Sequence, residues 1–292
     1  MTLVDTVRRF NRSYTQRIGA LEESFLGTGR PLGASRLLFE VGPDGAAVRD
    51  LRERLELDSG YLTRLVSRLA DDGLVEVLPD PADRRRRTVQ LTAAGQAAYR
   101  DLDERSERKA RGLLEPLTER QRARLDDALG TADLLIRAAT VRLRVVDPVS
   151  DPAGAALGEY YAELGRRFPE GFVPDPAHQG ADALRAPSGA FVVATSDGAP
   201  VACGGVRRFD RTTGEIKRMW VASSWRGAGL GTRLLRRLES EALSLGYSRA
   251  VLDTNRSLTE AIAMYGRAGY REIAPYSEDN PYAEMFFEKA LV

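Results

Sequence analysis

The sequence has almost none of the residues that usually build metal sites and covalent cross-links. Its 292 residues include one cysteine, Cys203, and one histidine, His178. A disulfide or a cysteine-based metal site within one chain is therefore excluded, and a histidine triad would rest on His178 alone. That residue lies in the loop-like stretch PDPAHQG, so we expect no metal and expect carboxylates, tyrosine or water to move protons. Cys203 stands in the strand-like stretch VACGGV, which favours a buried, unreactive thiol.

Long apolar runs are also missing. A stretch of about 18 apolar residues does not occur, so no membrane span is expected. The stretch MTLVDTVRRFNRSY lacks the apolar core of a signal peptide, and we therefore expect a cytoplasmic protein without a membrane partner. The formal net charge is +1, so any argument for nucleic-acid binding has to rest on local clusters.

Two Asp-Pro pairs in VVDPVSDPAG mark the clearest break in the chain, because proline cannot continue a helix. They predict two domains, over residues 1–146 and 147–292. Apolar spacing predicts a long first helix over residues 2–27. Further helices in this half are expected at about residues 33–41, 45–55, 59–72, 92–115 and 118–142. The second half alternates helices with strands and has a hairpin signal, Asp197-Gly198.

The segment LDSGYLTRLVSRLADDGLVEVL predicts a helix with Ser59 as its N-cap and Gly73 as its end. Leucine and valine residues repeat along one face. The opposite face carries the residue types that reach phosphates and base edges from the major groove: Ser59, Tyr61, Thr63, Arg64 and Arg68. Two short strands follow, and the tip between them, DRRRR, suits a minor groove or flanking backbone through Asp83, Arg84, Arg85 and Arg86.

This order, read in SGYLTRLVSRLADDGLVEVLPDPADRRRRTVQLTAAG, resembles the MarR family of transcriptional regulators over about residues 1–142. The resemblance implies a mainly-α winged helix-turn-helix and a homodimer built by the first and last helices of this domain. It further implies a palindromic double-stranded DNA operator and a wing in which Asp83 orients an arginine while Arg85 or a neighbour enters the minor groove. A merely solvated charged loop remains the alternative for DRRRR.

The glycine turn in SSWRGAGLGTRLL opens a predicted helix. Backbone N–H groups and the helix dipole favour an anion at such a position. A P-loop is excluded because no lysine follows, and the spacing Gly227-x-Gly229-x-Gly231 does not meet the dinucleotide fingerprint.

The run IKRMWVASSWRGAGLGTRLL, then LDTN, then AIAMYGRAGYREI resembles the GNAT acyltransferase superfamily over about residues 155–292. The resemblance implies an α/β fold with a mixed, mostly antiparallel sheet, and acetyl-CoA as cofactor with its pyrophosphate on the turn. The strand over residues 216–221 must then splay from its neighbour to accept the pantetheine arm. The implied cofactor-binding residues are Met219, Trp220, Val221, Arg226, Gly227, Ala228, Gly229, Leu230, Gly231, Thr232, Asn255 and Tyr265.

Direct transfer needs a proton for the departing thiolate and a neutral amine. By the resemblance, Tyr265 lies near the thioester sulfur and donates that proton. Glu215 is a candidate general base, directly or through water; a surface glutamate at a strand start is the alternative. Lys217 and Arg218 alternate across the strand, and one of them is expected to meet an acceptor carboxylate. The loops that hold Phe172 and Tyr282 are expected to frame the acceptor pocket.

These patterns predict a DNA-binding regulator joined to an acetyl-CoA-dependent N-acetyltransferase that acts on a small, amino-acid-like amine by direct transfer. Two alternatives stay open. In one, the second domain only senses an acyl-CoA or a metabolite without turnover. In the other, the first domain only dimerises an enzyme.

Overall fold

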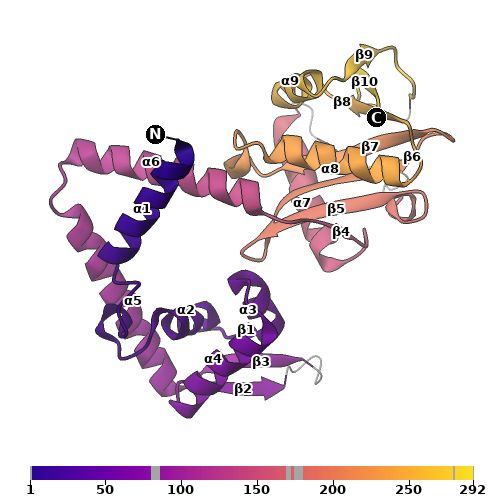
Figure 1. Cartoon of the computed structure of the whole chain (residues 1–292). Helices are drawn as coiled ribbons and strands as arrows, with labels where there is room; N and C mark the ends of the chain where they lie inside the picture. Colours follow the sequence, from indigo (N-terminus) through magenta and orange to yellow (C-terminus); the bar gives the residue numbers. More distant parts are fainter. Residues whose placement is uncertain (1, 80–85, 169–171, 174–179, 279, 292) are drawn as a thin grey trace. The chain divides into compact units, whose positions relative to one another are not determined.

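The computed structural model describes residues 2–79, 86–168, 172–173, 180–278 and 280–291. The chain divides into two compact units, Met1–Leu125 and Asp126–Val292 (Figure 1). This division falls inside the helix α6 (Glu119–Thr140), which begins in the first unit and ends in the second. The boundary between functional domains near residue 146 stays a prediction.

The first unit is mainly helical and carries a small sheet. Its helical elements are α1 (Leu3–Arg17), the 3-10 turn η1 (Phe25–Gly27), α2 (Leu32–Val41), α3 (Val48–Leu55), α4 (Ser59–Asp71) and α5 (Ala93–Leu114). Its strands β1 (Ala46–Ala47), β2 (Val75–Pro79) and β3 (Arg87–Leu91) pair antiparallel in the order β1-β3-β2. A helix pair followed by a two-stranded ribbon confirms the predicted winged helix-turn-helix.

The first helix is shorter than the sequence predicts. It ends at Arg17, and Gly19 has φ of 76°, a left-handed conformation that stops a right-handed helix. The prediction of one helix over residues 2–27 is therefore wrong, although the apolar spacing continues. The apolar spacing predicts which residues share a face of a helix, but it does not predict where the helix ends.

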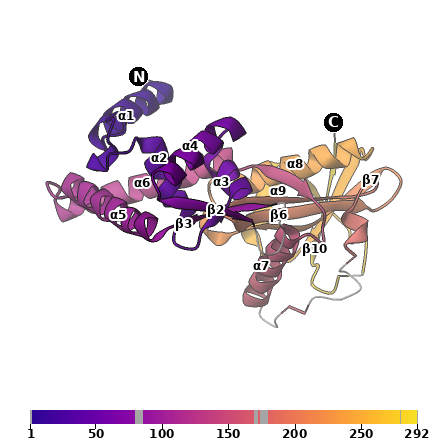
Figure 2. The same cartoon turned by 90° about the horizontal axis from the view of Figure 1, so that it is seen from below.

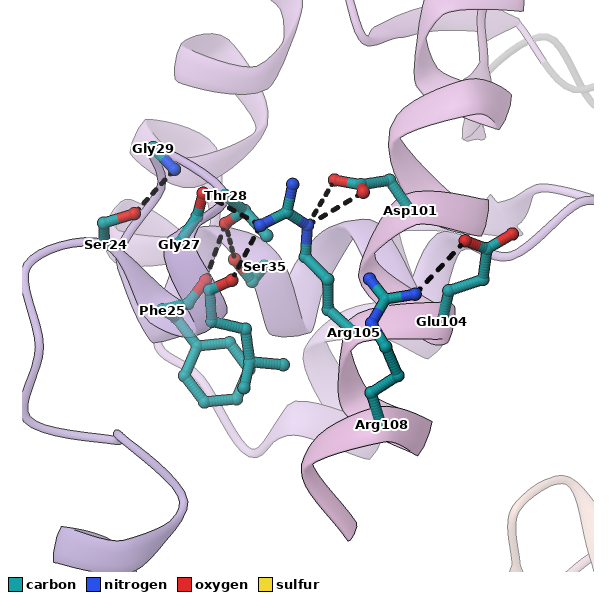
Figure 3. Close-up of polar contacts among 11 residues, drawn as sticks. Ser24, Phe25, Gly27, Thr28, Gly29, Ser35, Asp101, Glu104, Arg105 and Arg108 are labelled. Carbon is teal, nitrogen blue, oxygen red and sulfur yellow. Dashed lines mark hydrogen bonds and ion pairs between the residues drawn. The ribbon is translucent and has the colours of Figure 1, made fainter. Parts of the chain in front are cut away.

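The segment after α1 is held against α5 by one arginine (Figure 3). Arg105 donates to the carbonyl oxygens of Leu26 and Gly27 at 3.2 and 3.3 Å. Its Nε also lies 2.8 Å from Asp101 Oδ1, one turn earlier on the same helix. A guanidinium can bind both groups at once because its donors form a fixed planar fork.

The helix α4 has the predicted polar and apolar faces, with one correction at its start. Asp58, not Ser59, is the N-cap, and its Oδ1 accepts from the Tyr61 N–H at 2.9 Å. Gly73, with φ of 70°, follows the helix as predicted. Leu62 and Leu69 are fully buried in a core shared with α2 and α5, which fixes the opposite face toward solvent.

The second unit is a mixed sheet with helices on both faces. Its helical elements are α7 (Asp151–Arg167), the 3-10 turns η3 (Asp182–Leu184) and η4 (Ser223–Trp225), α8 (Leu230–Ser244) and α9 (Thr259–Arg267). Its strands are β4 (Leu143–Val146), β5 (Ala190–Ser196), β6 (Ala199–Arg208), β7 (Thr213–Val221), β8 (Arg249–Thr254), β9 (Arg271–Ile273) and β10 (Met285–Ala290). The strand order is β4-β5-β6-β7-β8-β10-β9. In the described sheet β7 and β8 pair parallel and the other neighbours antiparallel, which confirms the predicted mixed, mostly antiparallel sheet.

Two apolar clusters fill the two sides of this sheet. Helix α7 covers one face, and α8 with α9 covers the other (Figure 2). Four leucines of α8 are completely buried: Leu230, Leu234, Leu235 and Leu238. Arg233, on the same helix, donates to the carbonyl oxygens of Ala138 and Val141 and so fixes the end of α6.

Candidate functional site

An opening between β7 and β8 positions the site. The two strands pair only from Thr213 to Glu215 on β7, so residues 216–221 leave β8. The predicted splay is confirmed. On the other side, Arg218 and Met219 of β7 lie opposite the single residue Gly204 of β6, and Arg218 has φ of 56°. This bulge bends β7 away from regular pairing at the centre of the site.

A cavity of about 750 Å³ is formed at this opening. Most of the predicted site residues line it: Lys217, Arg218, Phe172, Tyr282, Met219, Trp220, Val221, Arg226, Gly227, Gly229, Gly231, Thr232, Asn255 and Tyr265. Glu215, Ala228 and Leu230 are not among its lining residues. The Leu230 side chain is buried in the core, so only its backbone N–H can serve an anion.

The expectation that Lys217 and Arg218 face opposite sides of the strand is wrong. Both line the same cavity. Strict alternation requires regular strand geometry. The bulge at Arg218, with its positive φ, interrupts that geometry and brings the two side chains to one side.

The glycine turn lines the cavity. Gly227 and Gly229 have φ of 78° and 83°, which L-residues with side chains rarely adopt. A Cβ placed on either would meet no protein atom within 4 Å, so open space lies above the turn. Gly229 is also the N-cap of α8 and supplies no side chain to cap it. The first N–H groups of this helix are therefore left for an anion.

Arg226 beside the turn is already paired in this structure. Its Nη2 contacts Glu163, and its Nε donates to the Val221 carbonyl at 3.1 Å. Trp220 Nε1 donates to Glu163 Oε2 at 2.9 Å, and Arg167 Nη1 lies 3.5 Å from Glu163 Oε1, the oxygen that Arg226 contacts. Although desolvation opposes them, the hydrogen bonds from Arg226 and Trp220 hold the pKa of Glu163 below its ordinary value.

Glu163 and Arg167 were not predicted as site residues. They stand four residues apart on a helix that the sequence does indicate, and nothing in the local pattern distinguishes them from solvated charges. Only the packing of α7 against β7 brings them to the cavity.

Tyr265 lies on α9, lines the cavity and is 6% exposed. Its hydroxyl points at Met219 Sδ, 3.9 Å away. Burial, with a smaller contribution from the charge of Asp253, raises the pKa of Tyr265 far above its ordinary value. The hydroxyl is therefore protonated at neutral pH.

Glu215 lies on β7, is not a lining residue of the cavity and is 2% exposed. Its oxygens accept from Arg207 Nε at 2.5 Å and Tyr276 at 3.1 Å, and Lys217 Nζ lies 3.2 Å away. The general-base role of Glu215 stays a prediction, and these contacts disfavour it because two cations hold the carboxylate. Asp253, 2.6 Å from Lys217 Nζ, does line the cavity and was missed.

In the first unit, the candidate DNA-binding face is exposed along α4. Ser59, Tyr61, Thr63, Arg64 and Arg68 are all solvent-facing. The Arg64 guanidinium lies 5.7 Å from the centre of the Tyr61 ring, a cation–π contact that orients it. At the wing, Asp83, Arg84 and Arg85 lie outside the described residues, as does His178. Arg86 is described and exposed.

Other chemistry is constrained by burial and composition. Cys203 is buried, and burial raises the pKa of its thiol to about 12, which makes it a poor nucleophile. Within the described ranges there is no cluster of three or more His, Cys, Asp or Glu side chains suited to a metal ion. No helix in the described part of the chain is long and apolar enough to cross a bilayer.

Comparison with known proteins agrees with this geometry. Residues 157–270 match the model of the acetyltransferase (GNAT) family. The chain is 36% identical over 110 residues to a protein named IAA acetyltransferase from Azospirillum brasilense, covering 37% of this chain and 72% of that protein. The chain belongs to the GNAT acetyltransferase family. A solved GNAT-family acetyltransferase from Staphylococcus aureus aligns with a TM-score of 0.44 and 17% identity, covering 52% of this chain and 100% of that one.

This GNAT acetyltransferase also has a region that is similar to the MarR family. Residues 28–86 match the model of the MarR family. The solved MarR of E. coli aligns with a TM-score of 0.38 and 24% identity, covering 45% of this chain and 97% of that one. The chain therefore joins a region similar to the MarR family to a GNAT-family acyltransferase, for which an acyl-CoA is the expected ligand. The open glycine turn and the cavity fit such a ligand.

Proposed function

We propose that this protein is a DNA-binding regulator and an acetyl-CoA-dependent N-acetyltransferase acting on a small amine. The observation that carries the enzymatic part is a single cavity with three features in one opening. The glycine turn, the protonated Tyr265 and the charged Lys217 all line it. Domains over residues 1–146 and 147–292 would hold the two activities.

The glycine turn is suited to a pyrophosphate. Gly227 and Gly229 let the backbone approach without Cβ interference, and the N-terminus of α8 supplies N–H donors. Arg226 adds a charge that is shared with Glu163 in this structure. A pyrophosphate would therefore compete with Glu163 for Arg226, and Arg167, which also reaches the cavity, would leave Glu163 partly compensated.

When bound, acetyl-CoA supplies an acetyl group activated as a thioester. Met219 and Val221 lie where β7 has left β8, so their backbone groups can pair with the pantetheine arm. The acceptor nitrogen forms the C–N bond as the C–S bond breaks. Of the two protons that an ammonium acceptor loses, one passes to solvent and the other reaches sulfur through Tyr265. The buried Cys203 gives no support to a covalent enzyme intermediate.

The first unit supports DNA binding and self-association. The exposed arginines of α4 suit phosphates and base edges, and a palindromic duplex is the proposed partner. Helix α1 exposes a row of apolar side chains, with Leu3 at 78%, Val7 at 55% and Phe10 at 52% exposure. Such a face supports the homodimer that a two-fold operator requires, because covering it removes apolar area from water.

The test is thiol release from acetyl-CoA across a panel of amines and amino acids, paired with a gel shift on DNA from the protein's own promoter region. Turnover with at least one amine and a salt-sensitive shift are expected. Absence of turnover while acetyl-CoA changes the DNA affinity would instead establish a sensor domain. Turnover without any shift would leave the first domain as a dimerisation module.

A further inference from the structure

Among the described residues, Asp253 is the only carboxylate on β8 that lines the cavity. The steps above give it no role. Its side chain is 6% exposed. Oδ1 lies 2.6 Å from Lys217 Nζ, whereas Oδ2 accepts from the neutral amide of Asn280 at 2.5 Å. Because Glu215 contacts both Arg207 and Lys217, Asp253 shares only one of the two cations. A cation entering the cavity would share Asp253 with Lys217, which keeps its second carboxylate partner, Glu215.

An aromatic cluster lines the same cavity. It consists of Phe168 and Phe172, which follow α7, and Tyr282, which precedes β10. The Phe172 and Tyr282 ring centres are 4.8 Å apart, and Phe168 lies 5.5 Å from Tyr282 and 5.8 Å from Phe172. The Tyr282 hydroxyl accepts from the Val173 N–H at 3.1 Å, which fixes its ring. An aromatic guest gains both burial and edge-to-face contacts against such rings.

One short segment joins the carboxylate to the rings. Asn280 donates to Asp253 through its side-chain nitrogen and accepts from the Tyr282 N–H at 3.1 Å through its side-chain oxygen. Asn280 and Tyr282 are two residues apart, so the backbone separates them by at most roughly 7 Å. A ligand with a short linker between its charge and its ring matches this spacing.

Asp253 is also close to the transfer chemistry. Its charge is felt at the Tyr265 hydroxyl, in addition to the larger effect of burial. A nitrogen held by Asp253 would therefore lie near the group that we propose protonates the leaving sulfur. The acceptor nitrogen must carry at least one N–H in its neutral form, because it has to lose that proton to become an amide, so the acceptor is a primary or secondary amine.

We propose that Asp253 binds the ammonium group of the acceptor while Phe168, Phe172 and Tyr282 hold an aromatic ring on the same molecule, so that the acceptor is an arylalkylamine. This inference rests on the proposed acetyl transfer. It names the acceptor class for that cavity, and it gives Asp253 a binding role distinct from the buried Glu215.

Binding of two isosteric probes to the full-length chain saturated with CoA tests the inference. Phenethylamine is a cation at neutral pH, whereas O-benzylhydroxylamine has the same ring and linker length and is uncharged. Calorimetry should show phenethylamine binding about tenfold or more tightly than ethylamine, because the ring is buried. Asp253→Asn should weaken phenethylamine about 10- to 100-fold and leave O-benzylhydroxylamine nearly unchanged, since a charged hydrogen bond is lost.

The aromatic cluster is tested by a matched pair of variants. Tyr282→Leu should reduce the preference for phenethylamine over ethylamine about 2- to 10-fold, whereas Tyr282→Phe, which keeps the ring, should keep most of that preference. Acetyl-CoA affinity, measured in parallel, reports whether each variant is folded.

The outcomes separate the inference from the function on which it rests. Equal binding of phenethylamine and ethylamine, or equal weakening of both isosteric probes by Asp253→Asn, would overturn the arylalkylamine site. Equal weakening would mean that Asp253 merely holds Lys217. The expected binding pattern without thiol release from acetyl-CoA would uphold the amine site and defeat the proposed transferase activity.

Discussion

Substitution of Gly229 by alanine separates stability from cofactor binding. Gly229 has φ of 83° at the N-cap of α8, and an added Cβ would meet no protein atom within 4 Å. The cost to the fold is therefore only the left-handed backbone, about 1–2 kcal/mol. That corresponds to a decrease in Tm of roughly 2–8 °C for a unit of this size.

Gly246 offers a matched control near the other end of the same helix. It has φ of 91°, and a Cβ there also meets nothing within 4 Å. Gly246→Ala should destabilise the protein by the same amount as Gly229→Ala, because the strain is of the same kind. It does not line the cavity, so cofactor binding should be unaffected.

The two variants should differ strongly in their affinity for acetyl-CoA. A methyl group at Gly229 fills the space through which a pyrophosphate reaches the backbone, so one or two charged hydrogen bonds of about 1.5–3 kcal/mol each are lost. The Kd for acetyl-CoA should rise roughly 10-fold to well over 100-fold in Gly229→Ala. Calorimetry and thermal unfolding on both variants provide the measurement. Equal Kd values in the two would refute the assignment of the turn to the pyrophosphate.

Three further predictions follow from the same structure. Tyr265→Phe should lower kcat roughly 100-fold with little change in acetyl-CoA affinity, and an unchanged kcat in stopped thiol-release assays would remove Tyr265 as the proton donor. Arg64→Ala should weaken DNA binding by about 1–3 kcal/mol in a gel shift and change the free energy of unfolding by less than about 0.5 kcal/mol. Because burial raises the pKa of Tyr265 and Tyr270 above 10.0, the unfolded state loses these protons first. The free energy of unfolding of the second unit should stay constant below about pH 10 and decrease above it. A free energy from urea titrations that does not change with pH would contradict this.

Much of the architecture follows from local sequence. The apolar spacing of Leu62 and Leu69 marks the buried face of α4, and Gly73 stops that helix by adopting positive φ. The turn with Gly227 and Gly229 falls where a strand meets a helix, and its spacing excludes the common nucleotide loops. These features are readable because each depends on a residue's own conformational preference or on neighbours within one or two turns.

Several details of the site were not readable in this way. Helix α1 ends at Arg17 although its apolar period continues, because a glycine in the left-handed region redirects the chain. Arg218 joins Lys217 on one side because a bulge interrupts β7. Strands β4 and β9 were not predicted, since such short segments gain their hydrogen bonds only from a neighbour already in the sheet.

The sequence by itself determined the order of the elements, the exposed arginines of α4 and the glycine turn. The tertiary structure decided which charges meet in the cavity. Glu163 reaches Arg226, and Asp253 reaches Lys217, across separations of 63 and 36 residues. Local patterns cannot contain such pairs, because their contact exists only once the helix and strands have packed and β7 has parted from β8.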